Sequence, residues 1–261
     1  MRYIAIDTNF WIYVASGVSP DDGKRNPGLY YKIIELLESL IQDQSIEIVV
    51  PEVIIQELVS HDEKLRSGIA KTENRKKVRL KEFRSFGKNL NGQDQQLLEE
   101  LAKRVDESLE NDVEIARSYH QRVKDIISSS RKIAISDAVK IQCSDWAFKK
   151  LPPFHGEKSS MADALIFFSV VEFIDSIKEE LPFDDDYIYP ESYFVTYNKK
   201  DFGEDQFFDG LREIAESRNI HFSTSITDTV FELTKTVNKE IEEELLRKEL
   251  LETEYDYYKN L

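Results

Sequence analysis

The fold is decided by the stretch Tyr3-Ile4-Ala5-Ile6-Asp7-Thr8-Asn9. Its apolar run is short and unbroken, as expected for a buried strand of a parallel sheet. An aspartate ends the run, and polar side chains that can cap a helix follow it. The second apolar run, residues 46–50, is followed by Pro51, a residue that suits the first position of a helix. Two strand-to-helix units of this kind predict an α/β fold with a parallel sheet.

Apolar spacing places the remaining elements of this core. Helical periodicity predicts helices over residues 30–41, 133–150 and 205–217, and apolar runs predict further strands at 193–196 and 219–223. Glycine and proline mark residues 17–28 as a loop. We therefore expect a sheet with at least four strands and helices between them.

A long helical segment separates the two halves of that core. Residues 62–130 contain few helix breakers, and from Leu97 to Ile127 the apolar positions recur every three to four residues. A continuous helix of that length would extend about 45 Å. We expect one domain over residues 1–223, interrupted by a helical insert at 62–130, and an acidic helical extension over 224–261.

Charge is unevenly distributed along the chain. The net charge of −15 argues against simple electrostatic binding of nucleic acid. Residues 64–88, however, contain ten lysines and arginines against two glutamates. Within this stretch, Arg75, Lys76, Lys77 and Arg79 are candidate phosphate contacts, because basic side chains neutralise a nucleic-acid backbone. The alternative is an ordinary solvated helix face, and the acidic tail could also cover the stretch.

Four carboxylates occupy positions where a parallel sheet builds a site. Asp7 ends the first strand, Glu57 lies in the helix after the second, Asp163 opens the helix over 164–168, and Asp201 follows the strand at 193–196. Ligands bind at the carboxyl ends of such strands. Each acid alone also has a simpler explanation: Asp7 and Asp163 could cap helices, and Asp201 could lie in an exposed turn.

Acids that converge at one sheet edge repel one another and cannot all remain ionised without a positive partner. Glu57 is placed near the apolar face of its helix, where a buried acid needs a hydrogen-bond partner or a cation. Hard divalent cations with oxygen ligands, such as Mg²⁺ or Mn²⁺, meet that need. The four acids are therefore candidate ligands for one or two such ions.

These motifs resemble the PIN-domain nuclease family. The resemblance rests on Asp7-Thr8-Asn9, on residues 51–58 with Glu57 as the acid, on Met161-Ala162-Asp163-Ala164 and on residues 196–202, all in the order that the family shows. It covers residues 1–60 and about 133–223. Residues 152–160 are similar to a larger bacterial PIN-like subgroup, whereas the segments 62–130 and 225–261 depart from the compact members.

The resemblance implies a three-layer α/β/α fold with a central parallel sheet of about four to five strands, a long helical insertion and a C-terminal helix. It implies metal-dependent cleavage of phosphodiester bonds, usually in RNA. Asp7 and Asp163 would then be central catalytic metal ligands, with Glu57 and Asp201 bound directly or through water. Three further residues would orient carboxylates or waters, namely Asn9, Thr196 and Asn198.

Lys158 precedes the helix of Asp163 and could contact the scissile phosphate. A solvated loop lysine is the alternative.

The expected function is an endoribonuclease with a role as a toxin or defence effector. Two alternatives stay open: a catalytically silent module that binds RNA or protein, and a structure-specific DNA nuclease. The expected partners are RNA, a protein inhibitor or a second copy of the chain. A single cysteine, Cys143, indicates a reducing compartment, and no apolar run reaches the roughly 20 residues that a membrane span needs, so we expect a cytoplasmic protein.

Overall fold

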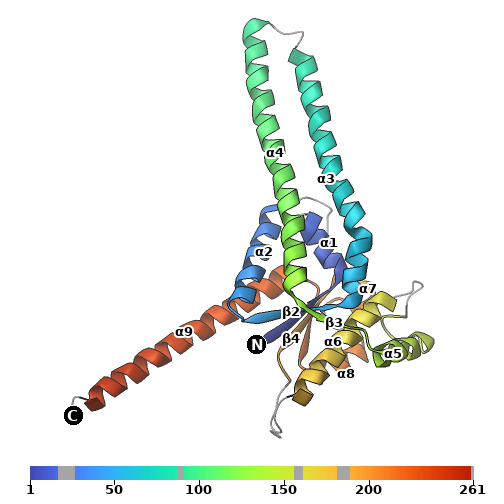
Figure 1. The fold of residues 1–261 in the computed structure, drawn as a ribbon, viewed down its shortest axis with the longest axis vertical. Helices are drawn as coiled ribbons and strands as arrows, with labels where there is room; N and C mark the ends of the chain where they lie inside the picture. The colour runs from blue at the N-terminus through green and yellow to red at the C-terminus, as the bar shows by residue number, and fades with distance from the viewer. Residues whose placement is uncertain (17–26, 88–90, 156–160, 181–188, 260–261) are drawn as a thin grey trace.

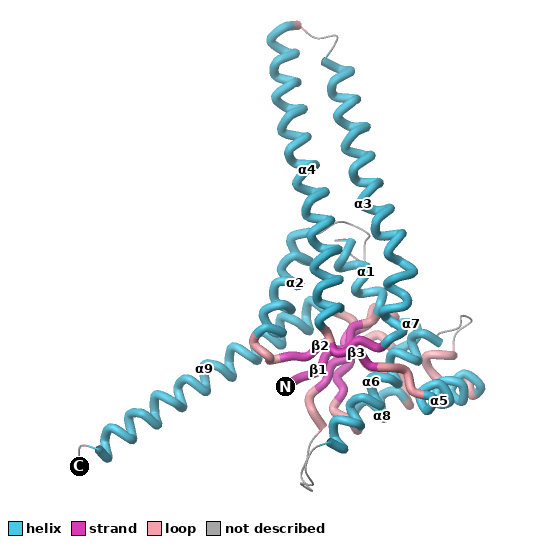
Figure 2. The backbone as a smooth tube through the Cα atoms, viewed as in Figure 1, coloured by secondary structure: helices cyan, strands magenta, loops and turns pink. Residues whose placement is uncertain are grey.

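A parallel β-sheet forms the centre of the protein in the computed structural model, which describes residues 1–16, 27–87, 91–155, 161–180 and 189–259 (Figure 1). Within the described residues the sheet has five strands in the order β3-β2-β1-β4-β5, all parallel. Figure 2 shows the strands gathered at the centre of the molecule with helices around them. The strands are β1 (Arg2–Ile6), β2 (Ile46–Pro51), β3 (Arg131–Ile133), β4 (Ser192–Val195) and β5 (Ile220–Ser223).

The strand order reverses at the centre of the sheet. From β1 the chain proceeds outward through β2 to β3, and it then returns to place β4 on the other side of β1. Ile4 pairs in register with Ile48 of β2 and with Tyr193 of β4. The carboxyl ends of β1 and β4 therefore meet at a switch point, which is where open α/β sheets bind ligands.

Helices cover both faces of the sheet, as the three-layer prediction requires. They are α1 (Thr8–Ser16), α2 (Pro27–Gln42), α3 (Glu52–Gly87), α4 (Gly92–Ser129), α5 (Asp137–Phe148), α6 (Met161–Glu180), α7 (Lys199–Phe202), α8 (Leu211–Glu216) and α9 (Ile226–Lys259). Helix α6 packs on the sheet through Phe173, which meets Tyr3 edge-on at 5.3 Å, and through Phe167, which meets Phe194 at 5.4 Å. Ile4 and Ile6 point to the opposite face and are fully buried.

Buried aromatic side chains pack beneath the switch point. Phe167 and Phe194 are joined by Phe202 and Phe207, and all four rings are buried. Phe202 ends α7, the short helix that contains Asp201. The turn after β4 is thus fixed by an aromatic cluster beneath it, and burying an aromatic side chain of this size stabilises a fold by about 1.5–3 kcal/mol.

Helices α3 and α4 form a long hairpin, the arm, that extends away from the sheet (Figure 1). The arm helices are joined at their base by Asp62 of α3, whose Oδ1 lies 2.9 Å from Nε2 of His120 and 2.8 Å from Nζ of Lys124. Helix α3 runs without a break from Glu52, so the sheet edge and the arm share one helix. The division into a domain over 1–223 with an insert at 62–130 and an extension over 224–261 stays a prediction.

Two predicted helices, 133–150 and 205–217, start too early. Ile133 belongs to strand β3, whose residues 131–133 pair in parallel with β2, as Val49 with Arg131. Helix α5 begins only at Asp137, where the Ser136 hydroxyl accepts a hydrogen bond from the backbone N–H of Val139 at 3.1 Å. The helix predicted over 205–217 shrinks to α8, residues 211–216.

The loop predicted over 17–28 lies largely outside the described residues, and α2 already begins at Pro27. In the described part of the chain, no helix combines the length and the apolar character that crossing a bilayer requires.

Candidate active site

Asp7 lies at the carboxyl end of β1 and is almost completely buried. The hydroxyl of Thr196, just past β4, donates a hydrogen bond to Asp7 Oδ2 at 2.8 Å. The backbone N–H of Asp7 donates to the carbonyl oxygen of Val195 at 2.9 Å, so backbone and side chain both connect the ends of β1 and β4. Burial raises the pKa of Asp7 to about 6, although the Thr196 hydrogen bond acts to lower it.

Glu57 joins this position from the first turns of α3. The hydroxyl of Thr8 donates a hydrogen bond to Glu57 Oε2 at 2.5 Å, and Thr8 follows Asp7 directly in the chain. The negative charge of Glu57 contributes to the raised pKa of Asp7, so the two carboxylates interact. Glu57 is therefore oriented toward the end of β1, as its position near the apolar face of the helix predicts.

Asp163 lies in the first turn of α6, and the charges of all three other predicted acids act on its pKa. Its pKa is raised to about 7, first by burial and then by the charge of Asp7. The Asn198 side chain lowers the pKa through a hydrogen bond, while the charges of Asp201 and Glu57 raise it further. The charge of each of the other three predicted acids therefore acts on Asp163, and we call these four residues the acid cluster.

Asp201 completes the cluster from α7. The side-chain amide of Asn198 donates a hydrogen bond to Asp201 Oδ2 at 2.6 Å. The backbone N–H of Asn198 in turn donates to the Thr196 hydroxyl at 2.9 Å, and that hydroxyl holds Asp7. A chain of hydrogen bonds thus runs from Asp201 through Asn198 and Thr196 to Asp7, and it fixes the acids on either side of the switch point.

The donor chemistry of this acid cluster suits a hard divalent cation. Its members offer only carboxylate oxygens, which are the ligands that such cations prefer. The charges that act on Asp163 are the negative charges of the three other acids, which a cation would offset. Across the described residues, no three Asp, Glu, His or Cys side chains are arranged to enclose an ion. Two of the acids accept hydrogen bonds from neutral hydroxyl groups. Thr8 donates to Glu57, and Thr196 donates to Asp7.

The other predicted site residues differ in where they lie. The exposed Asn9 side chain hydrogen-bonds to Asp7 and so belongs to the acid cluster. Lys158 lies outside the described residues. Arg75, Lys76, Lys77 and Arg79 are all on the arm, where the side chains of Lys77 and Arg79 are exposed and those of the other two are not described.

The arm residues do not line the acid cluster. Lys77 comes 20 residues after Glu57 in the same helix, which is about 30 Å at a rise of 1.5 Å per residue.

Thr8 supports an acid of the cluster, although the sequence predicted only helix capping for it. Its side chain is buried and holds Glu57, the acid contributed by a different element. No pattern in the sequence marks this pairing, because it depends on the rotation of α3 about its own axis.

One comparison with known proteins identifies a family. A family model described as PIN domain matches residues 4–202, a range that contains all four acids and the arm. No curated protein matches the chain, and no solved structure does either.

Proposed function

The chain belongs to the PIN-domain family, whose members are generally nucleases, and from this we propose that it is a metal-dependent endoribonuclease. The observation that carries the proposal is the acid cluster, in which Asp163 interacts with Asp7, Glu57 and Asp201 at the switch point of the sheet. Mutually repelling, partly buried carboxylates lower the stability of a fold unless protons, hydrogen bonds or a cation offset the cost. Acids with pKa values perturbed in this way are typical of functional sites.

In this proposal the acid cluster holds one or two Mg²⁺ or Mn²⁺ ions. Asp7 and Asp163 are the central ligands, and Glu57 and Asp201 bind directly or through water. An ion held by these carboxylates would supply Lewis-acid chemistry, activating a water as nucleophile and offsetting negative charge on the phosphate. The four carboxylates must be ionised to do this, so the ion has to overcome the raised pKa values of Asp7 and Asp163.

The neutral side chains around the acids keep them in position. Thr196 holds Asp7 through Oδ2, and hydrogen bonds from the Thr8 backbone and the Asn9 side chain also act on this carboxylate. Thr8 does the same for Glu57 through Oε2, and Asn198 for Asp201 through Oδ2. The exposed Asn9 is the member of this group that can also reach substrate or water. Orienting hydrogen bonds of this type preserve metal affinity and activity.

RNA is the proposed substrate, and a toxin or defence effector acting in the cytoplasm is the proposed role. Both follow from the resemblance to the PIN family. Lys158 is proposed to contact the scissile phosphate, and Arg75, Lys76, Lys77 and Arg79 to contact more distant phosphates. A protein inhibitor and a second copy of the chain are the other proposed partners.

The test is cleavage of three substrates by the purified protein with Mg²⁺ or Mn²⁺: single-stranded RNA, structured RNA and flapped DNA. We expect cleavage of RNA that EDTA stops and that Asp7→Asn abolishes, with the circular dichroism spectrum unchanged. Preference for flapped DNA would instead support the structure-specific DNA nuclease. Binding of RNA without cleavage under any metal would support the catalytically silent module.

A further inference from the structure

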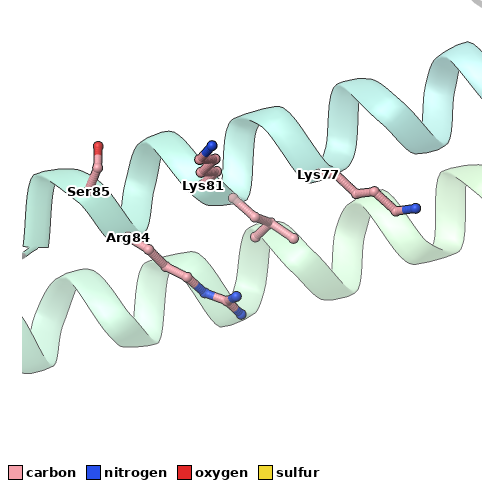
Figure 3. A pocket seen from close by; sticks show the side chains of 5 residues that line it. Lys77, Lys81, Arg84 and Ser85 are labelled. Atoms are coloured by element: carbon pink, nitrogen blue, oxygen red, sulfur yellow. The ribbon is translucent and has the colours of Figure 1, made fainter.

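A group of unpaired basic side chains lies far out on the arm. Lys77, Lys81 and Arg84 line a groove of about 520 Å³ together with Leu80 and Ser85, all on α3 (Figure 3). In the described part of the chain none of the three cations forms an ion pair, and the exposed Arg79 between them forms none either. Most described basic residues elsewhere do have such a partner, for example Arg117 with Glu73 farther down the arm.

Among the side chains that the structure describes, no acid forms an ion pair with Lys77, Lys81 or Arg84. The neighbouring helix α4 carries Glu99 and Glu100, which line a separate groove with Lys103. The acidic helix α9 leaves the body in a different direction from the arm, so within one molecule it does not cover the groove (Figure 1). Unpaired cations on a chain of net charge −15 indicate a ligand with negative charge.

The arm holds the groove at a fixed distance from the acid cluster. Helix α3 is continuous from Glu57 to Arg84, which puts Lys77 at about 30 Å and Arg84 at about 40 Å from Glu57. Ion pairs tie the base of the arm to the body, because Arg122 of α4 donates to Oε1 of Glu38 in α2 at 3.0 Å. Tyr119 and Val123 of α4 are buried against the core as well.

We propose that the groove of Lys77, Lys81 and Arg84 binds the phosphate backbone of a helical RNA stem whose other end lies in the acid cluster. This inference rests on the proposed function and specifies its substrate class. A stem must then span 30–40 Å, which is about 9–12 base pairs at roughly 3.4 Å per pair and somewhat more for the shorter rise of RNA. A stiff duplex bridges that distance without the ordering cost that a flexible single strand must bear.

The charge pattern of the arm sets the side from which the stem approaches. Phosphates are attracted to α3 and repelled by the exposed Glu99 and Glu100 on α4. Contacts of this kind carry no sequence information, so the arm selects for length and helical form rather than for bases.

The experiment measures binding with the Asp163→Asn protein, so that it needs no cleavage. The ligands are RNA hairpins with stems of about 6, 12 and 20 base pairs, so that one stem is shorter than the proposed span and one is longer. A single-stranded RNA with as many nucleotides as the longest hairpin serves as the comparison. The arm variant carries Lys77→Gln, Lys81→Gln and Arg84→Gln. A matched control carries Lys140→Gln, Lys149→Gln and Lys235→Gln, which remove the same charge from exposed, ion-paired lysines elsewhere.

We expect affinity to rise sharply between the shortest and the middle stem, and the arm variant to lose about tenfold or more on the longest stem. The plot of log K against the logarithm of the salt concentration should also become less steep for the arm variant. Its slope should shrink by about 2.7, because each of the three lost phosphate contacts contributes about 0.9. The control should match the parent protein. Equal affinity of the arm variant and the control would overturn the inference, and so would equal binding of stem and single strand.

These results are separable from the proposed cleavage. Length-dependent binding through the arm, without cleavage by the unmutated protein, would retain the groove and reject the nuclease. Cleavage that is lost in Asp163→Asn, with stem binding that ignores the arm, would retain the nuclease and reject the groove.

Discussion

Asn in place of Asp163 should make the metal-free protein more stable while removing its activity. Burial and the charges of neighbouring acids raise the pKa of Asp163 from 3.8 to about 7. At pH 8 the carboxylate is ionised in the folded state at a cost of about 1.36 kcal/mol for each unit of that shift, or about 4 kcal/mol. Asparagine has nearly the same shape, carries no charge and can still accept a hydrogen bond from Asn198.

The sign of the pH dependence follows from the direction of the shift. Below pH 3.8 Asp163 is protonated in both the folded and the unfolded state, and burial of the group costs no charge. As the pH rises from 3.8 to about 7 the unfolded chain ionises first, so the stability of the wild type falls through this window. The advantage of Asp163→Asn should therefore be about 4 kcal/mol at pH 8 and only about 1.5 kcal/mol at pH 5.

Urea denaturation in EDTA at both pH values measures this difference. The control is Asp145→Asn, which removes an exposed acid paired with Lys149 and should change stability by less than about 1 kcal/mol. A variant that is no more stable than the wild type at pH 8, or whose gain is the same at both pH values, would refute the reasoning. It would mean that Asp163 does not bear the electrostatic cost assigned to it.

Three other predictions concern the acid cluster. Mn²⁺ at 100 times its Kd should stabilise the wild type by about 2.7 kcal/mol in thermal unfolding but should have much less effect on Asp163→Asn; an equal shift in both proteins would place the ion elsewhere. Thr196→Val should destabilise the fold by about 1–3 kcal/mol, because the Asn198 N–H and the Asp7 carboxylate both lose the hydroxyl that they share. The same variant should cleave RNA more slowly. An unchanged rate of cleavage would show that Thr196 does not support the site. At subsaturating metal concentration, the rate of cleavage should decline as the pH falls below about 7, because protonated Asp163 cannot bind a cation. A cleavage rate that is independent of pH between about 5 and 8 would contradict the raised pKa of Asp163.

The convergence of the acids could be predicted because topology alone enforces it. In a parallel sheet every strand ends at the same edge, so Asp7 and Thr196 had to meet once β1 and β4 were recognised as neighbouring strands. Glu57 and Asp163 follow from the helices that start at that edge. The family match over residues 4–202 supports the same identification of the fold.

Other features carried too little signal in the sequence. Strand β3 has three residues, and two of them, Arg131 and Lys132, are charged and exposed at the sheet edge, so no apolar run marks it. The partner of Thr8 depends on the rotation of α3 about its axis, which periodicity does not determine. The distance between the arm cations and the acids became clear only because α3 is unbroken from Glu52 to Gly87.

Metal-dependent cleavage of RNA by the wild type beside Asp163→Asn and Asp145→Asn tests the central claim most directly. The account predicts that Mg²⁺ or Mn²⁺ supports cleavage by the wild type and by Asp145→Asn, and that Asp163→Asn is inactive although it is folded and more stable. Cleavage by Asp163→Asn at the wild-type rate would contradict the claim that the four acids form the active site.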